Sequence, residues 1–187
     1  FFGIRMTRRI ELLADQPVLT IATVFEKVTG DPVAASVWVI TQFKEPVGLY
    51  VPVPANSKFT NGCRIIIPPA PPSLQVANGL LSLTRNPRTA HKIGTEAGVL
   101  LWVGDRVMCR VDSPREPGAE YPDEGCSAEV YTNPDPLPYI ELETLGPLRR
   151  LKVGDTLERR NTYTLLRRTS ASPEADARRA LGLRTAE

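Results

Sequence analysis

One stretch of the chain combines a strand pattern with candidate chemistry: PYIELETLGPL, residues 138–148. If residues 139–143 form a strand, Tyr139, Glu141 and Glu143 share one face, while Ile140 and Leu142 point into a core, because strand side chains alternate. Alternate residues lie ~6.5–7 Å apart. Two carboxylates at that spacing suit the two sides of a sugar ring, one as acid or base and one as its partner, with the aromatic ring stacking beside them. A solvent-facing strand with ordinary polar alternation fits the same pattern.

Short strands are predicted along most of the remaining chain. Period-2 and β-branched runs indicate strands at residues 8–13, 18–26, 34–43, 47–51, 63–67, 80–84, 99–103, 106–111, 128–132, 139–143 and 156–166. Residues 29–32 (TGDP) predict a hairpin between the strands at 18–26 and 34–43, residues 104–105 (GD) predict a second hairpin, and residues 153–155 (VGD) predict a turn. The 18 prolines among 187 residues are about twice the average usage of ~5%. They exclude a helical bundle and favour an all-β, antiparallel protein.

The strand pattern, and the helical pattern that follows it, divide the chain into a β domain and a tail. Residues 1–170 read as one β-sandwich domain, with extended or loop segments at 68–73 (PPAPPS) and 113–125 (SPREPGAEYPDEG). Residues 171–187 read as a short helical tail. Ser172 and Pro173 supply an N-cap and a first-turn proline, and Gly182 ends the helix.

Composition excludes several classes of function. A formal net charge of +2 does not fit a dedicated nucleic-acid binder, and the longest apolar runs are far below the ~20 residues that span a bilayer. Cys63, Cys109 and Cys126 form no metal-binding pattern, and no dinucleotide or P-loop motif is present, so we expect no metal and no cofactor. The first residues do not form a secretory signal, which leaves a cytoplasmic or an exported, processed protein as alternatives.

A second candidate stretch is ASVWVITQF, residues 35–43. As a strand it places Trp38 and Gln42 on one face, where they can form a sugar platform with a hydrogen-bonding neighbour. Both faces are largely apolar, which favours a central strand of a two-layer structure. A tryptophan that simply packs in the core is the alternative.

The chain has a single histidine, His91, followed by Lys92. His91 is expected on a loop or at the start of a strand, where it can titrate near neutral pH, and Lys92 can contact an anionic substrate group. A surface or structural histidine is the alternative.

Taken together, these motifs resemble the galactose-mutarotase-like (aldose 1-epimerase-like) superfamily. The resemblance rests on residues 138–148, then LKVGD at 151–155, then TYTL at 162–165, with residues 18–43 similar to the family's hairpin. Within the superfamily, the motif pattern is most similar to that of an uncharacterised bacterial branch with W-x-I-T-Q and E-x-E strands. The resemblance covers residues 8 to 168. It implies an antiparallel β-sandwich or supersandwich, of which this chain lacks the N-terminal part.

The resemblance also implies roles for particular residues. The family's catalytic glutamate, which takes the proton of the anomeric hydroxyl, falls on Glu143, with Glu141 as the alternative. The family's histidine falls near Ile40 and Thr41, neither of which can donate a proton to a sugar ring. His91 substitutes for it only if the fold brings it near.

Three functions follow as hypotheses. The first is a carbohydrate-active protein that binds a sugar on a concave sheet through Trp38, Gln42, Tyr139 and Lys92, with Glu141, Glu143 and His91 as acid–base groups. The second is a carbohydrate-binding module without catalysis. The third is a structural β domain completed by oligomerisation, with a second copy covering an exposed sheet edge.

Overall fold

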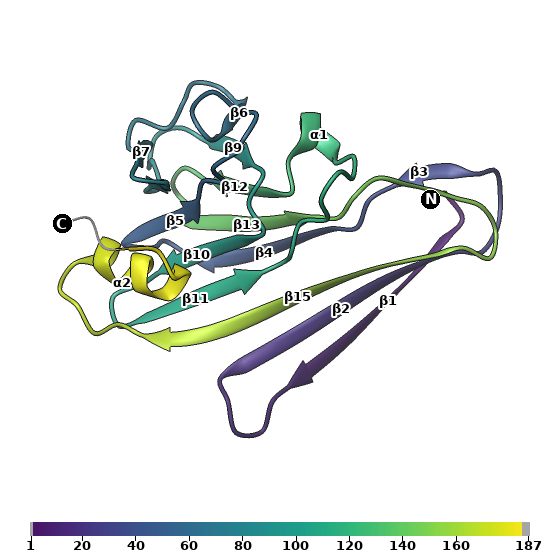
Figure 1. The fold of residues 1–187 in the computed structure, drawn as a ribbon, viewed down its shortest axis with the longest axis horizontal. Coiled ribbons are helices and arrows are strands. Elements are labelled where there is room, and N and C mark those ends of the chain that lie inside the picture. Colours follow the sequence, from purple (N-terminus) through teal and green to yellow (C-terminus); the bar gives the residue numbers. More distant parts are fainter. Residues whose placement is uncertain (1, 185–187) are drawn as a thin grey trace.

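A computed structural model of the chain describes residues 2–184. Two antiparallel sheets form the body of the molecule (Figure 1). The larger sheet has the strand order β1 (Ile4–Leu12), β2 (Val18–Lys27), β15 (Thr156–Arg167), β11 (Val107–Asp112), β10 (Val99–Val103), β5 (Gly48–Pro52), β8 (Leu80–Leu83), β7 (Gln75–Ala77). The smaller sheet has the order β4 (Trp38–Lys44), β13 (Tyr139–Leu145), β12 (Ala128–Thr132), β9 (His91–Thr95), β6 (Arg64–Ile67). The short strands β3 (Val33–Ala35) and β14 (Arg149–Leu151) pair with each other.

The main core lies between these two sheets. Leu49, Leu100 and Val111 of the larger sheet and Ile140 and Leu142 of the smaller one are almost completely buried there. In each strand the residues of opposite parity point away from this core, as the alternation of a β-strand requires. The outer face of each sheet is therefore available for other contacts.

A second, smaller core lies on the outer face of the larger sheet. The helix α2 (Pro173–Leu181) begins at Ser172, whose side chain accepts a hydrogen bond from the Ala175 amide, and ends at Gly182 in a left-handed conformation. These are the capping residues that the sequence predicts. Ala177 of α2 packs with Leu101 and Met108, so the helix is docked on β10 and β11 (Figure 1).

The hairpin expected from residues 29–32 is wrong. β2 pairs with β1 on one side and β15 on the other, and the expected strand at 34–43 is divided between β3 and β4. The division falls at Ser36 and Val37, where the Ser36 hydroxyl donates to the Gly146 carbonyl over 2.7 Å and the Gly146 amide donates to the Val37 carbonyl over 2.9 Å. β4 is the edge strand of the smaller sheet and not a central strand. The other two turns are confirmed: β10 and β11 form a hairpin, and residues 153–155 precede β15.

The segment 113–125 is more than a surface loop. Its end forms the short helix α1 (Pro122–Gly125), and Tyr121 and Gly125 are buried. Arg159 of β15 donates to the carbonyls of Ser113 and Pro114, which ties the beginning of the segment to the larger sheet. The strands β7, β9 and β14 are also absent from the expected set.

One part of the larger sheet is left uncovered. Within the described residues β1 pairs only with β2, and its apolar side chains Met6, Ile10 and Leu12 are exposed. Beside them, an apolar cavity of about 290 Å³ is lined partly by Leu19, Ile21 and Phe43. Figure 1 shows β1 and β2 at the lower side of the molecule, away from the smaller sheet. None of the helices among the described residues is long and apolar enough to cross a bilayer.

Candidate functional site

Most of the site residues predicted from the sequence lie on the outer face of the smaller sheet. Glu143 lies opposite Ile40 and Glu141 opposite Gln42 in the pairing of β13 with β4. On the other side of β13, Glu143 lies opposite Glu129 of β12. Residues directly opposite each other in an antiparallel pair point to the same face. The pairing therefore puts three carboxylates on one surface of the sheet.

Lys92 is the centre of this arrangement. Its ammonium nitrogen lies 2.7 Å from Oε2 of Glu129 and 3.0 Å from Oε2 of Glu143. The same nitrogen lies 4.5 Å from the centroid of the Trp38 ring, which is a cation–π contact. We call Trp38, Lys92, Glu129 and Glu143 the lysine cluster. Through the Lys92 side chain the cluster connects four strands of the smaller sheet: β4, β13, β12 and β9.

Trp38 lies between the buried groups of the cluster and solvent. Its indole N–H donates to Oε2 of Glu143 over 2.7 Å, and 45% of the residue is exposed. Trp38 is therefore not a core tryptophan. One side of its ring contacts the Lys92 ammonium, and its exposed surface adjoins Ile40, which is also exposed. The two form an apolar patch above the buried carboxylates.

Burial raises the pKa of the two inner carboxyl groups. Glu129 is 0% and Glu143 is 1% exposed. Burial raises the pKa of Glu129 to about 7, an effect that Lys92 opposes and Asp123 adds to. Burial likewise raises the pKa of Glu143, against the lowering effects of Lys92 and the Trp38 indole. Glu129 can therefore exchange a proton near neutral pH.

Lys92 remains the cation of the cluster. Burial by itself lowers the pKa of its ammonium, but the hydrogen bonds and charges of Glu129 and Glu143 outweigh burial and raise that pKa above the ordinary value. One ammonium thus serves two carboxylates. A proton on Glu129 leaves the Lys92–Glu143 pair neutral, so charge balance favours the protonated form of Glu129.

The segment around α1 covers the inner end of the cluster. Asp123 of α1 is close enough to Glu129 to raise its pKa, and Glu124 pairs with Arg64 of β6. Cys126 fills the space above Gly94, where a Cβ atom would lie 2.3 Å from the cysteine sulfur. Glycine at position 94 is therefore required for this cover. Burial raises the pKa of the Cys126 thiol to about 12, with Glu129 adding to the effect, so the thiol stays neutral.

The outer part of the same face stays accessible. The Gln42 amide donates to Oε1 of Glu141 over 2.9 Å, and both groups belong to exposed or half-buried residues. Further along the strands, the rings of Tyr139 and Tyr131 lie 6.3 Å apart at 45°. Polar and aromatic groups therefore continue from the Trp38–Ile40 patch along β4 and β13.

His91 lies apart from the cluster. It is 1% exposed and begins β9, so its side chain points away from that of Lys92, the next residue. Its ring nitrogens lie 2.8 Å from the Pro69 carbonyl and 3.1 Å from the Asn86 amide. The fold therefore brings Glu143, Trp38 and Lys92 together, places Glu141, Gln42 and Tyr139 beside them, and leaves His91 on the other face.

Sequence reasoning missed Glu129. The signal was available, because Glu129 and Tyr131 alternate with Ala128 and Val130 as Glu141 and Glu143 alternate with Ile140 and Leu142. The sequence pattern does not show that β12 lies next to β13 with Glu129 opposite Glu143. Among residues 2–184, no three histidine, cysteine, aspartate or glutamate side chains are arranged to hold a metal ion.

Comparison with solved structures identifies the fold. An Escherichia coli K12 protein described as a "putative aldose 1-epimerase" superposes with a TM-score of 0.63 at 11% identity, covering 89% of this chain and 62% of that one. A galactose mutarotase-like protein from Lactobacillus casei gives 0.60 at 12% identity, covering 88% and 65%. A galactose mutarotase related enzyme from Lactobacillus acidophilus gives 0.55 at 10% identity, covering 88% and 63%.

The chain is an antiparallel β-sandwich with the galactose-mutarotase-like fold, which confirms the resemblance drawn from its motifs. It spans less than two thirds of the length of each of these three structures. No protein-family model and no curated protein sequence matches it.

Proposed function

We propose that the outer face of β4 and β13 binds a carbohydrate. The observation that carries the proposal is the half-exposed Trp38, held by the buried carboxylate of Glu143 and the largely buried ammonium of Lys92. A fixed aromatic ring presents apolar surface to the C–H side of a sugar without losing side-chain freedom on binding. The likeness to mutarotase-like structures supports the same class of ligand.

The neighbouring groups supply what a sugar also needs. Gln42 and Glu141 form a hydrogen-bonded pair on the two strands beside Ile40. An amide and a carboxylate in fixed orientation can exchange hydrogen bonds with vicinal hydroxyls. In this proposal Trp38 and Ile40 stack on the ring of the sugar, and Gln42, Glu141 and Tyr139 orient its hydroxyl groups.

Acid–base chemistry on the bound sugar is the second candidate, favoured by the lysine cluster. Glu143 would take the proton of the anomeric hydroxyl while the Lys92 ammonium gives a proton to the ring oxygen, and protonated Glu129, with its pKa raised to about 7, would reprotonate Lys92. Both carboxylates are covered in this conformation, so turnover requires the sugar to displace part of the cover. Binding without turnover requires no such movement and is the function that the geometry supports best.

One experiment separates the two. The protein is titrated with a panel of aldoses while amide chemical shifts report binding, and saturation transfer between the anomeric protons reports epimerisation or cleavage. We expect saturable shifts at residues 38–42 and 139–143, weakened by Trp38→Ala and unchanged by Trp102→Phe. If no sugar shifts these amides, the proposal fails. If Glu143→Gln abolishes anomer exchange while Glu158→Gln, on the surface of β15, leaves it intact, the protein is catalytic.

The open edge of β1 supports a further role in assembly. Its outer backbone edge, which has no partner among residues 2–184, and its exposed Met6, Ile10 and Leu12 can be covered by β1 of a second copy in antiparallel pairing. A two-fold axis brings the same apolar face of both copies together, and this self-complementarity favours a second copy as the partner.

A further inference from the structure

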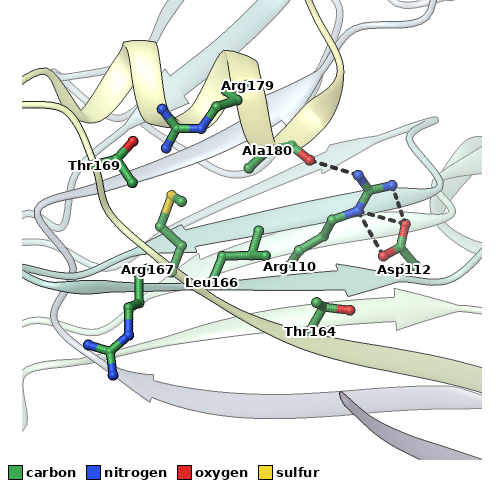
Figure 2. A pocket seen from close by; sticks show the side chains of 9 residues that line it. Arg110, Asp112, Thr164, Leu166, Arg167, Thr169, Arg179 and Ala180 are labelled. Atoms are coloured by element: carbon green, nitrogen blue, oxygen red, sulfur yellow. Dashed lines mark hydrogen bonds and ion pairs between the residues drawn. The ribbon is translucent and has the colours of Figure 1, made fainter. Parts of the chain in front are cut away.

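A cavity of about 490 Å³ lies on the side of the molecule away from the lysine cluster, between α2 and the outer face of the larger sheet (Figure 2). Its lining comes from β11, β15, α2 and the connection between β15 and α2: Met108, Arg110, Asp112, Thr164, Leu166, Arg167, Thr169, Arg179 and Ala180. The volume falls within the range of ~300–1,000 Å³ that is typical of small-molecule sites. It shares no residue with the proposed carbohydrate face.

Arg110 is held in a fixed orientation at one side of the cavity. Its Nε lies 3.0 and 2.8 Å from the two oxygens of Asp112, and one terminal nitrogen lies 2.7 Å from Oδ1 of the same carboxylate. The other terminal nitrogen donates to the Ala180 carbonyl over 2.7 Å. A guanidinium has five N–H donors, and these contacts use three. Two donors therefore remain for a ligand on a group that loses little freedom on binding.

Positive charge exceeds negative charge around the cavity. Arg179 of α2 and Arg168 share the single carboxylate of Asp176, so these three groups carry one positive charge in excess, whereas Arg110 and Asp112 balance each other. Figure 2 shows Arg179 above the cavity and Arg110 at its right, while the Arg167 side chain points away from both. Arg167 follows Leu166 in β15, so its side chain lies on the opposite face of the sheet. Half-exposed arginines in excess attract anions, and their planar donor pairs fit a phosphate or carboxylate group.

The remaining lining residues provide two hydroxyl groups and an apolar wall. The hydroxyl groups of Thr164 and Thr169 make no hydrogen bond to the described part of the chain, so both are available as donors. Met108, Leu166 and Ala180 provide an apolar wall. We propose that this cavity binds a small molecule carrying a phosphate or carboxylate group, with Arg179, the Thr169 hydroxyl and the two spare donors of Arg110 available to contact the oxyanion.

The test uses the whole chain and two probes, inorganic phosphate and citrate, each compared with sodium chloride at the same ionic strength. Amide chemical shifts are followed during titration. We expect saturable changes at residues 110, 164, 169 and 179 with phosphate or citrate and none with chloride. The tighter probe identifies the oxyanion. Removing the charge-assisted contact in Arg179→Gln should weaken binding about tenfold, and removing one hydroxyl donor in Thr169→Val should weaken it about fivefold.

Arg150→Gln is the matched control, because Arg150 is an exposed arginine on β14 that does not line the cavity. Its affinity for the probe should equal that of the wild type. Shifts that follow ionic strength alone, affinity unchanged in both Arg179→Gln and Thr169→Val, or no saturable change with either probe would each overturn the proposal. Because Thr169 is exposed and its hydroxyl makes no hydrogen bond to residues 2–184, its variant keeps the test decisive even if Arg179→Gln unfolds.

Discussion

The Trp38 indole N–H and the Glu143 carboxylate are joined by a 2.7 Å hydrogen bond across neighbouring strands, although 105 residues separate them in the chain. In the register of β4 and β13, Trp38 lies opposite Leu145, and Glu143 opposite Ile40, so the pair is diagonal. Diagonal neighbours lie within reach of a long aromatic side chain. This bond couples the most exposed ring of the site to one of its least exposed charges.

Replacing Trp38 by phenylalanine keeps a ring and removes the N–H donor. Because that donor lowers the pKa of the Glu143 carboxyl, we expect the pKa to rise further in Trp38→Phe. Carbon-detected NMR titration of the glutamate carboxyl groups measures the change. Trp102→Phe is the control, since the Trp102 indole donates to the Lys44 carbonyl and makes no hydrogen bond to a carboxylate of residues 2–184. An unchanged titration in Trp38→Phe contradicts the assignment of this bond.

Lys92→Met removes the one cation among residues 2–184 that contacts both buried carboxylates. Leaving buried charges without their partner is strongly destabilising, and we expect a loss of about 3 kcal/mol in the free energy of unfolding at pH 8. Urea denaturation measures it. Lys44→Met, on the same face but exposed at the end of β4, should change stability by no more than ~0.5 kcal/mol. Equal effects in the two variants would mean that the lysine cluster is not a stabilising unit.

Glu129 predicts a particular pH dependence of stability. Its pKa is raised from 4.5 to about 7 on folding, so the folded state binds the proton more tightly than the unfolded state. The contribution is complete below pH 4.5 and is lost as the pH rises to about 7, by about 3 kcal/mol in total. Glu143 adds a loss of the same sign.

The comparison that checks this is Glu129→Gln, with unfolding free energies measured between pH 5 and pH 8. The variant should lose much less stability over this range than the wild type, and Glu158→Gln should keep the wild-type slope. A wild-type stability that is flat or rises with pH would contradict the raised pKa of Glu129.

Asp176 predicts the opposite behaviour in acid. Although burial raises its pKa, the hydrogen bonds from Arg168, the Thr169 and Ser170 amides and Arg179 outweigh it and hold that pKa at about 2. The stabilisation is present above pH 3.8 and is lost as the pH falls toward 2, by about 2 kcal/mol. Asp176→Asn should remove most of this acid dependence, as seen by thermal unfolding at pH 4 and pH 2, whereas Asp31→Asn in an exposed turn should retain it.

Pairing through β1 predicts concentration-dependent dimers. Light scattering of the wild type should show a rising mean mass with protein concentration, and Ile10→Lys, which puts a charge on the apolar face of the edge strand, should hold the protein as a monomer. Thr7→Ser is the control, because it alters only the polar face. A wild type that stays monomeric at every concentration would refute this role for β1.

The strand at 139–145 illustrates what local pattern can predict. Its alternation correctly assigned Ile140 and Leu142 to the core and Glu141 and Glu143 to the other face, because alternation depends on the backbone of one strand alone. The capping of α2 was predicted for the same reason, since Ser172 and Gly182 act on their own helix.

The pairing of the strands could not be predicted from local pattern. The run at 34–43 has the pattern of one strand, yet the chain leaves one sheet at Ala35 and enters the other at Trp38. Besides β1, β2 pairs with β15, more than a hundred residues later, in preference to β3, the next strand in the chain. β9 was missed because Gly94 interrupts its β-branched residues, although it is the glycine that admits Cys126.

Sequence pattern and motifs were enough to predict which side chains share a face, an antiparallel β-sandwich of mutarotase-like type, and a candidate site that includes Trp38 and Glu143. That Lys92 and Glu129 meet Glu143, that α1 covers them and that His91 stays on the other face became visible only in the folded molecule. Alternation is a property of one strand, whereas the register between strands and the burial that shifts a pKa depend on contacts between residues far apart in the chain.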